Sequence, residues 1–172
     1  KDIINSKKPL VVLGESFLEL KSANYLFYSL KEFLSKSNKF TQDWNPLNIL
    51  STDASTVGSI DLDLVDQNNS ILDDLKQNKF EIIYLLNQDN LDFIKKEEFI
   101  IYQGSHGDKG AEIADIILPG AAYTEQSGHF TNLEGKIQKA FKASYPPGDS
   151  KEDWQIINEI AETMNNRKLF ND

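Results

Sequence analysis

The glycine-rich stretch at residues 103–110, with the sequence QGSHGDKG, has the residue types and spacing best suited to ligand chemistry. It follows an apolar run, and a predicted helical turn comes after it. Glycine lets a backbone approach a ligand closely, and free N–H groups at the carboxyl ends of parallel strands can hold an anion. The spacing matches neither G-x-G-x-x-G nor a P-loop. A tight turn with glycine at positive φ is therefore the structural alternative, and both interpretations stay open. The candidate residues here are Gln103, Gly104, His106, Gly107, Asp108 and Gly110.

A second stretch, residues 119–135, closes another apolar run with small side chains. Small residues permit close backbone approach, either to a flat cofactor or to another loop, and packing is the favoured interpretation. The candidate residues here are Pro119, Gly120, Tyr123, Glu125, Asn132, Glu134 and Gly135.

Acid–base and nucleophilic catalysis find little support in the sequence. Asp115, Glu125 and Glu134 could form paired carboxylates, but nothing in the sequence fixes their separation, and surface roles are favoured. Ser105 and His106 are adjacent, and we expect this adjacency to keep them from pointing at each other as nucleophile and base.

Composition narrows the possible functions further. The 172 residues contain no cysteine and two histidines, which excludes thiolate ligation of iron–sulfur clusters or zinc within this chain. The net charge of −9 argues against a nucleic-acid partner. The longest apolar runs have strand length, so we expect no direct membrane insertion. Because the first residue is Lys1, we expect a piece of a longer or processed polypeptide.

Apolar periodicity predicts one α/β domain over residues 1–172: a mostly parallel, open, Rossmann-like sheet with flanking helices, a β-hairpin-like segment and a C-terminal helix. The predicted strands are 9–14, 80–86, 99–102 and 113–118, with a hairpin over 129–142. The predicted helices are 21–36, 46–56, 71–77, 108–113 and 151–164, and residues 57–70 are predicted to form a surface loop. Ser150 and Asp153 resemble a capping box for the last helix.

Residues 114–138, ADIILPGAAYTEQSGHFTNLEGKIQ, are similar to a signature of molybdopterin oxidoreductases. The version at residues 119–125 resembles the large iron–sulfur subunit (75-kDa type) of NADH:quinone oxidoreductase, respiratory complex I. Residues 100–108 and 146–154 strengthen the match, which covers about 99–161. Residues 1–98 match weakly, mainly through the run at 9–14.

This resemblance implies a non-catalytic segment of a redox enzyme. The family's large iron–sulfur protein carries its clusters in a cysteine-rich N-terminal part, through which electrons pass from NADH toward quinone. Its C-terminal, molybdopterin-oxidoreductase-like part has generally lost pterin and metal, and this chain would be a segment of that part. Lys136 stands where the broader signature often has arginine, which weakens a bidentate phosphate or pterin contact.

The implied partners are the rest of the same subunit and other subunits of the hydrophilic arm. We expect the candidate residues of 103–110 and 119–135 to form the contact surfaces, because glycine-rich loops at strand ends can pack closely. The implied location is peripheral, on the cytoplasmic face of a bacterial inner membrane or the matrix side of the mitochondrial one. Two other functions stay open: a pterin-binding fragment of a molybdenum oxidoreductase that uses the same loops, and an isolated domain with an unknown ligand at the sheet's end.

Overall fold

The computed structural model describes residues 2–66, 71–91, 94–165, 167 and 169–170. They form two compact units, one made of residues 1–62 and 131–137, the other of residues 63–130 and 138–172. Both units contain parallel strands and helices, so the predicted α/β class is confirmed. The single domain over 1–172 stays a prediction.

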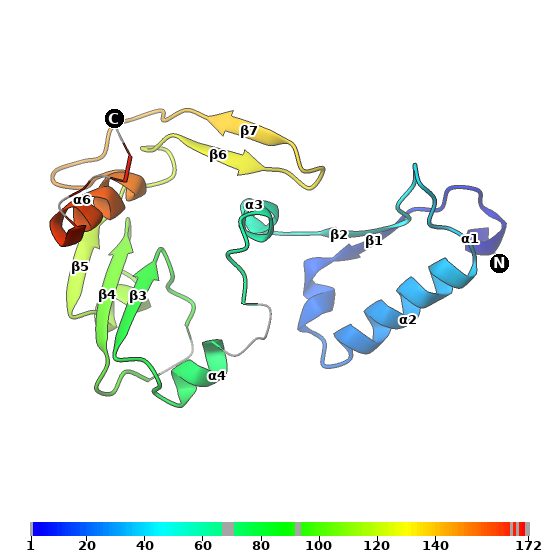
Figure 1. The fold of residues 1–172 in the computed structure, drawn as a ribbon, viewed down its shortest axis with the longest axis horizontal. Helices are drawn as coiled ribbons and strands as arrows, with labels where there is room; N and C mark the ends of the chain where they lie inside the picture. Colours follow the sequence, from blue (N-terminus) through cyan, green and yellow to red (C-terminus); the bar gives the residue numbers. More distant parts are fainter. Residues whose placement is uncertain (1, 67–70, 92–93, 166, 168, 171–172) are drawn as a thin grey trace. The chain divides into compact units, whose positions relative to one another are not determined.

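Unit 1 is built around a pair of parallel strands. Its elements are α1 (Asp2–Asn5), β1 (Val11–Gly14), the 3-10 helix η1 (Glu15–Glu19), α2 (Ala23–Lys36), β2 (Leu47–Leu50) and α3 (Thr56–Asp61). Strand β1 pairs with β2 in register, with Val11 opposite Leu47 and Gly14 opposite Leu50 (Figure 1). Leu34 of α2 is fully buried, so the predicted helix over 21–36 supplies core packing as expected.

Two predictions in this unit are wrong. Residues 46–56 were expected to be helical, yet residues 47–50 form strand β2. The stabilising partner of β2 is β1, which lies far from it in the sequence, and the Val11 N–H donates to the Pro46 carbonyl at 2.8 Å. Residues 57–70 were expected to be a loop, but helix α3 occupies their beginning. Residues 67–70 of that predicted loop lie outside the described residues.

Unit 2 contains a three-stranded parallel sheet in the order β3-β4-β5. Its elements are α4 (Ile71–Lys76), β3 (Ile82–Leu86), β4 (Phe99–Gly104), α5 (Lys109–Ile113), β5 (Ile116–Pro119) and α6 (Asp153–Asn165). Leu85, Ile100 and Tyr102 form the buried core, packed against half-buried side chains of α5 and the loops beside it. The three strands predicted here from apolar runs are confirmed, although the strands predicted for one sheet lie in two (Figure 1).

The opposite face of this sheet carries exposed apolar side chains. Strand residues alternate between faces, and this face presents Ile82, Tyr84, Leu86, Phe99 and Ile116, which are 39–64% exposed. Parallel sheets are normally covered on both faces. This face of unit 2 is therefore suited to packing against further polypeptide.

The predicted hairpin is confirmed as strands β6 (Gly128–Thr131) and β7 (Ile137–Ala140). Gly135 in the turn has φ +76°, a conformation that favours glycine. Within the described ranges, none of the helices has the length and apolar character needed to cross a bilayer.

Candidate functional site

The carboxyl ends of β3, β4 and β5 meet at one side chain, Asp153 at the start of α6. Gln103 Nε2 donates to Asp153 Oδ1 at 2.8 Å, and Asn87 Nδ2 donates to Oδ2 at 3.1 Å. Gln126 Nε2 donates to the same Oδ2 at 3.2 Å. Asn87 follows β3, Gln103 lies near the end of β4 and Gln126 lies in the loop between β5 and β6, so one carboxylate joins these segments to α6.

Gln103 is the buried centre of this network, with a side chain that is 0% exposed. Its Oε1 accepts a hydrogen bond from the Tyr84 hydroxyl, and its Nε2 also lies 3.3 Å from the Asp153 carbonyl. Both polar ends of this buried amide are thus satisfied within unit 2, as buried polar groups require.

The start of α6 differs from the predicted capping box. The helix begins at Asp153, and the Ser150 hydroxyl donates to the Pro147 carbonyl at 2.7 Å. The Glu152 N–H instead donates to Gln155 Oε1 at 3.2 Å, a side chain three residues later. Gln155 therefore takes the reciprocal part that was assigned to Asp153, which leaves the Asp153 carboxylate for the strand ends.

Tyr102 explains two of the glycines in residues 103–110. A Cβ on Gly110 would lie 2.7 Å from both the Tyr102 ring and the Gln88 carbonyl oxygen, and one on Gly104 would overlap the same ring. Positive φ occurs in neither glycine, so the expected turn conformation is not the reason for them. Glycine stands at these positions because the Tyr102 ring fills the space of a side chain. The Gly110 N–H also donates to Asp89 Oδ1 at 3.0 Å.

The Tyr102 hydroxyl anchors the loop that the glycines form. Its oxygen lies 3.0 Å from Asp89 Oδ2 and 2.9 Å from the His106 carbonyl oxygen. Burial, together with the hydrogen bond to Asp89, raises the pKa of Tyr102 to about 12. The phenol is therefore a neutral structural donor at physiological pH.

Tyr102→Phe is expected to lower the free energy of unfolding by about 1 kcal/mol at pH 8, because one buried hydrogen bond is lost. The wild-type advantage should shrink between pH 10 and 12. An unfolded tyrosine loses its proton near 10, whereas the folded one holds it to about 12, so rising pH favours the unfolded wild-type chain. Urea unfolding of both proteins at pH 8 and pH 11 measures this difference. An unchanged difference between the two pH values would refute the assignment.

The expectation that the Ser105 and His106 side chains do not meet is wrong. Despite their adjacency, Ser105 Oγ lies 2.9 Å from His106 Nδ1, so the two side chains do meet. Adjacent residues in an irregular loop are not held to opposite sides as they are in a strand. Both residues are exposed, as are Gly107 and Asp108.

Residues 119–125 divide into a buried and an exposed part. Gly120 is buried, and a Cβ there would lie 3.0 Å from Asp153 Oδ1, so the missing side chain lets α6 approach the sheet. Pro119 is exposed. Tyr123 is 85% exposed, and Glu125 accepts a local hydrogen bond from the Ala122 N–H at 3.0 Å.

The remaining candidates of the second stretch belong to the hairpin turn. Asn132 Oδ1 accepts hydrogen bonds from the N–H groups of Glu134 and Lys136 at 3.0 and 2.9 Å. Glu134 and Gly135 are exposed. Residues 131–137 belong to unit 1, whereas residues 103–125 belong to unit 2.

The three acidic residues considered for acid–base work have separate local surroundings. Asp115 pairs with Lys95 at 2.6 Å and accepts the Ile100 N–H at 2.8 Å, and this backbone hydrogen bond, with Lys95, lowers the pKa of Asp115. Glu125 and Glu134 sit in the turns described above. The contacts of these groups are those of turn and strand-end residues.

Unit 1 has a similar arrangement at the carboxyl ends of its own parallel strands. Glu15, directly after β1, accepts hydrogen bonds at Oε2 from the Thr52 N–H and hydroxyl, both at 2.5 Å. Ser51 Oγ, after β2, lies 3.3 Å from the same oxygen. The hydrogen bonds from Thr52 lower the pKa of Glu15. The contact between Glu15 and Thr52 was not predicted from the sequence, because residues 46–56 were expected to be helical.

A bound pterin with its phosphate groups fits these residues poorly. Parallel sheets of this class bind anionic ligands with N–H and hydroxyl donors at the strand ends. Here Glu15 accepts the N–H and hydroxyl of Thr52, Asp153 accepts side-chain amides, and each carboxylate would repel an anion placed beside it. Within the described part of the chain, no three His, Asp or Glu side chains are grouped to hold a metal ion.

Comparison with known proteins agrees with the resemblance found in the sequence. The family model described as molybdopterin oxidoreductase matches residues 1–163. The chain is 41% identical over 97% of its length to the NADH-ubiquinone oxidoreductase 78 kDa subunit, mitochondrial, of Candida albicans. It is 39% identical over 97% of its length to the NADH-ubiquinone oxidoreductase 75 kDa subunit of Reclinomonas americana. It is 44% identical over 91% of its length to one of the NADH-quinone oxidoreductase subunits of Rickettsia typhi.

The chain spans 22–24% of the length of these relatives. The family model, by contrast, covers nearly all of the chain and both of its parallel sheets. The chain belongs to the molybdopterin oxidoreductase family.

Proposed function

We propose that this chain is a structural segment of a subunit of NADH:quinone oxidoreductase and serves assembly. In this proposal the complex transfers electrons from NADH to quinone through iron–sulfur clusters that lie outside the segment. The segment belongs to an oxidoreductase but is itself non-catalytic. The observation that carries the proposal is that Glu15 and Asp153 occupy the carboxyl ends of the parallel strands in their units. Each carboxylate accepts hydrogen bonds there from residues of this chain.

Composition supports the placement of the clusters elsewhere. Iron–sulfur clusters are held mainly by cysteine thiolates, and this chain has none. The chain spans only 23% of its Candida albicans relative, so most of that relative's sequence is available to hold the clusters.

The exposed apolar side chains support a role in contacts with other polypeptides. Patches of exposed apolar surface mark interaction sites, and one face of the β3-β4-β5 sheet presents several such side chains. We propose that the partners are the rest of the same subunit and other subunits of the hydrophilic arm. We propose as contact residues the exposed candidates of the two loop stretches, which are His106, Gly107, Asp108, Pro119, Tyr123, Glu134 and Gly135.

We propose a peripheral location, on the cytoplasmic face of a bacterial inner membrane or the matrix side of the mitochondrial one. The mitochondrial and bacterial origins of the relatives support this pair of locations. The alternative, a pterin-binding fragment, is opposed by the two carboxylates at the strand ends. Stoichiometric molybdenum or a pterin absorbance band in the purified protein would favour that alternative.

Deleting the segment from the complete subunit tests the proposal. The amount of assembled complex on a native gel should fall several-fold, and NADH oxidation in membranes should fall with it. A subunit carrying Asp149→Ala, a change at an exposed position outside the proposed contact loops, is the control and should assemble normally. Normal assembly and normal NADH oxidation after the deletion would refute the proposal.

A further inference from the structure

Glu98 is a buried carboxyl group that lacks one of its hydrogen-bond partners. The residue is 6% exposed. Its Oε1 accepts the Lys96 N–H at 3.0 Å, whereas Oε2 is buried and has no hydrogen-bond partner among the described residues. A buried polar atom without a partner lowers stability. A group of this kind is expected to have its partner outside the chain.

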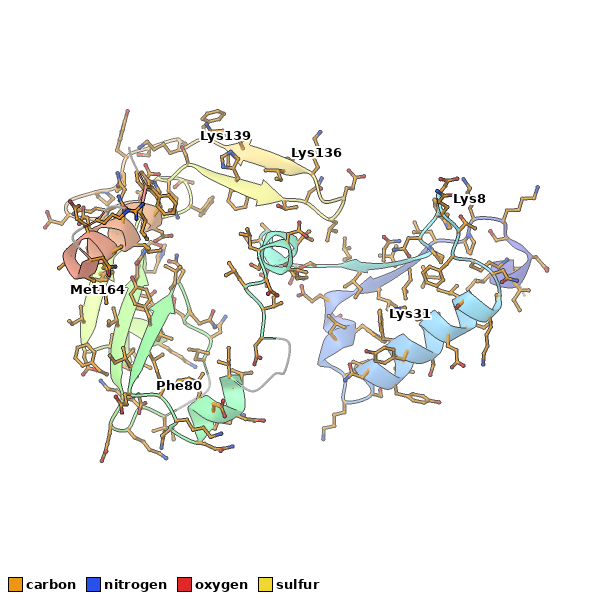
Figure 2. All side chains as sticks on the ribbon, in the orientation of Figure 1. Lys8, Lys31, Phe80, Lys136, Lys139 and Met164 are labelled. Atoms are coloured by element: carbon orange, nitrogen blue, oxygen red, sulfur yellow. The ribbon has the colours of Figure 1, made fainter. Side chains whose placement is uncertain are left out.

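Glu98 lines a cavity of about 440 Å³ at the amino-terminal ends of β3 and β4. The other lining residues are Asn78, Phe80, Glu81, Lys96 and Glu97. Three glutamates face one lysine there, so the cavity is acidic. Figure 2 labels Phe80 at the end of the sheet opposite α6, which separates this cavity from the Asp153 network.

Two neighbouring lysines are already engaged with other carboxylates. Lys79 pairs with Asp74 and Lys95 pairs with Asp115, both at 2.6 Å. A metal ion is also a poor partner, because no group of three potential ligands suited to a metal occurs in the described ranges. A single cationic group needs only the carboxylate and space beside it.

We propose that this cavity receives a cationic side chain, lysine or arginine, from a neighbouring polypeptide of the assembled complex. The cation would supply the missing hydrogen-bond partner of Glu98 Oε2 and would be attracted by Glu81 and Glu97. The cavity's acidic lining supplies the charge complementarity. This inference rests on the proposed assembly role and adds the chemistry of one contact.

The experiment compares Glu98→Gln with Glu97→Gln in the complete subunit. Both changes remove one negative charge from the same cavity, but Glu97 is exposed. Reconstituted complexes are dissociated by increasing salt, and the melting temperature of each free subunit is measured. Glu98→Gln should weaken association at least about tenfold while leaving the free subunit as stable as wild type or more stable. Glu97→Gln should change association less than about twofold.

Two results would overturn the inference. One is association of the Glu98→Gln subunit with wild-type strength. The other is a lower melting temperature of the free Glu98→Gln subunit, which would show that Glu98 stabilises the fold of the free subunit. Either result leaves the assembly role standing, because that role fails only if the complex forms normally without the segment.

Discussion

Asp153→Ala is expected to lower the free energy of unfolding by about 2–4 kcal/mol, because it leaves the buried amide of Gln103 and the half-buried amide of Gln126 without their carboxylate acceptor. Gln103 is fully buried and loses its 2.8 Å hydrogen bond, while Asn87 and Gln126 lose theirs at 3.1 and 3.2 Å. The side-chain contacts of the strand ends to Asp153 would be lost, whereas the backbone hydrogen bonds that join Pro119 and Ala121 to Lys151 would remain. Urea unfolding followed by circular dichroism measures the change.

Asp149→Ala is the matched control for this prediction. Asp149 lies four residues earlier in the sequence, carries the same charge and is exposed. Its replacement should change stability by less than about 0.5 kcal/mol. Equal effects of the two variants would show that Asp153 acts only through net charge and would remove the proposed role of the network.

Gly110→Ala is expected to cost about 2–3 kcal/mol through overpacking. The new methyl group would lie 2.7 Å from the Gln88 carbonyl oxygen, which is backbone, and 2.7 Å from the Tyr102 ring. Neither can move without disturbing the buried core around Tyr102. Any gain in helix propensity from alanine in α5 is at most about 1 kcal/mol, so the steric term prevails.

Gly107→Ala provides the comparison within the same loop. A Cβ at Gly107 meets no heavy atom within 4 Å, and Gly107 is exposed. Alanine should therefore be neutral or stabilise the chain by up to about 1 kcal/mol. If both alanine variants were equally stable in denaturant titrations, the explanation of these glycines by the Tyr102 ring would be wrong.

The elements that sequence pattern predicted well are those with dense local signals. The apolar runs before Gln103 and Pro119 correspond to β4 and β5, and the turn at Asn132 and Gly135 joins β6 to β7. Strand β2 was missed because its four residues carry no strong periodicity and depend on pairing with the distant β1. Nonlocal pairing of this kind leaves little trace in a short window of sequence.

The glycines of the first candidate loop were noticed in the sequence, but one of the reasons offered for them was wrong. The glycines at 104 and 110 were identified, yet positive φ was offered as their reason, whereas the Tyr102 ring is what requires them. Asp153 was noticed only as a capping residue, because its three amide partners come from separate loops and strand ends. The signal that could have found the network is an amide side chain, Gln103, at the end of a buried strand.

Glu15 and Asp153 have the same role in their respective units. In each unit a carboxylate follows or faces the carboxyl ends of parallel strands and accepts the donors there. The donors are the Thr52 N–H and hydroxyl in unit 1 and side-chain amides in unit 2.

Electron transfer per assembled complex, measured with a subunit that carries Asp153→Ala, tests whether the segment is structural and not catalytic. If the segment is structural, the amount of complex should fall, while NADH oxidation and the iron–sulfur signals in electron paramagnetic resonance should stay unchanged per complex. A normal amount of complex with a reduced cluster signal or reduced oxidation rate per complex would contradict it.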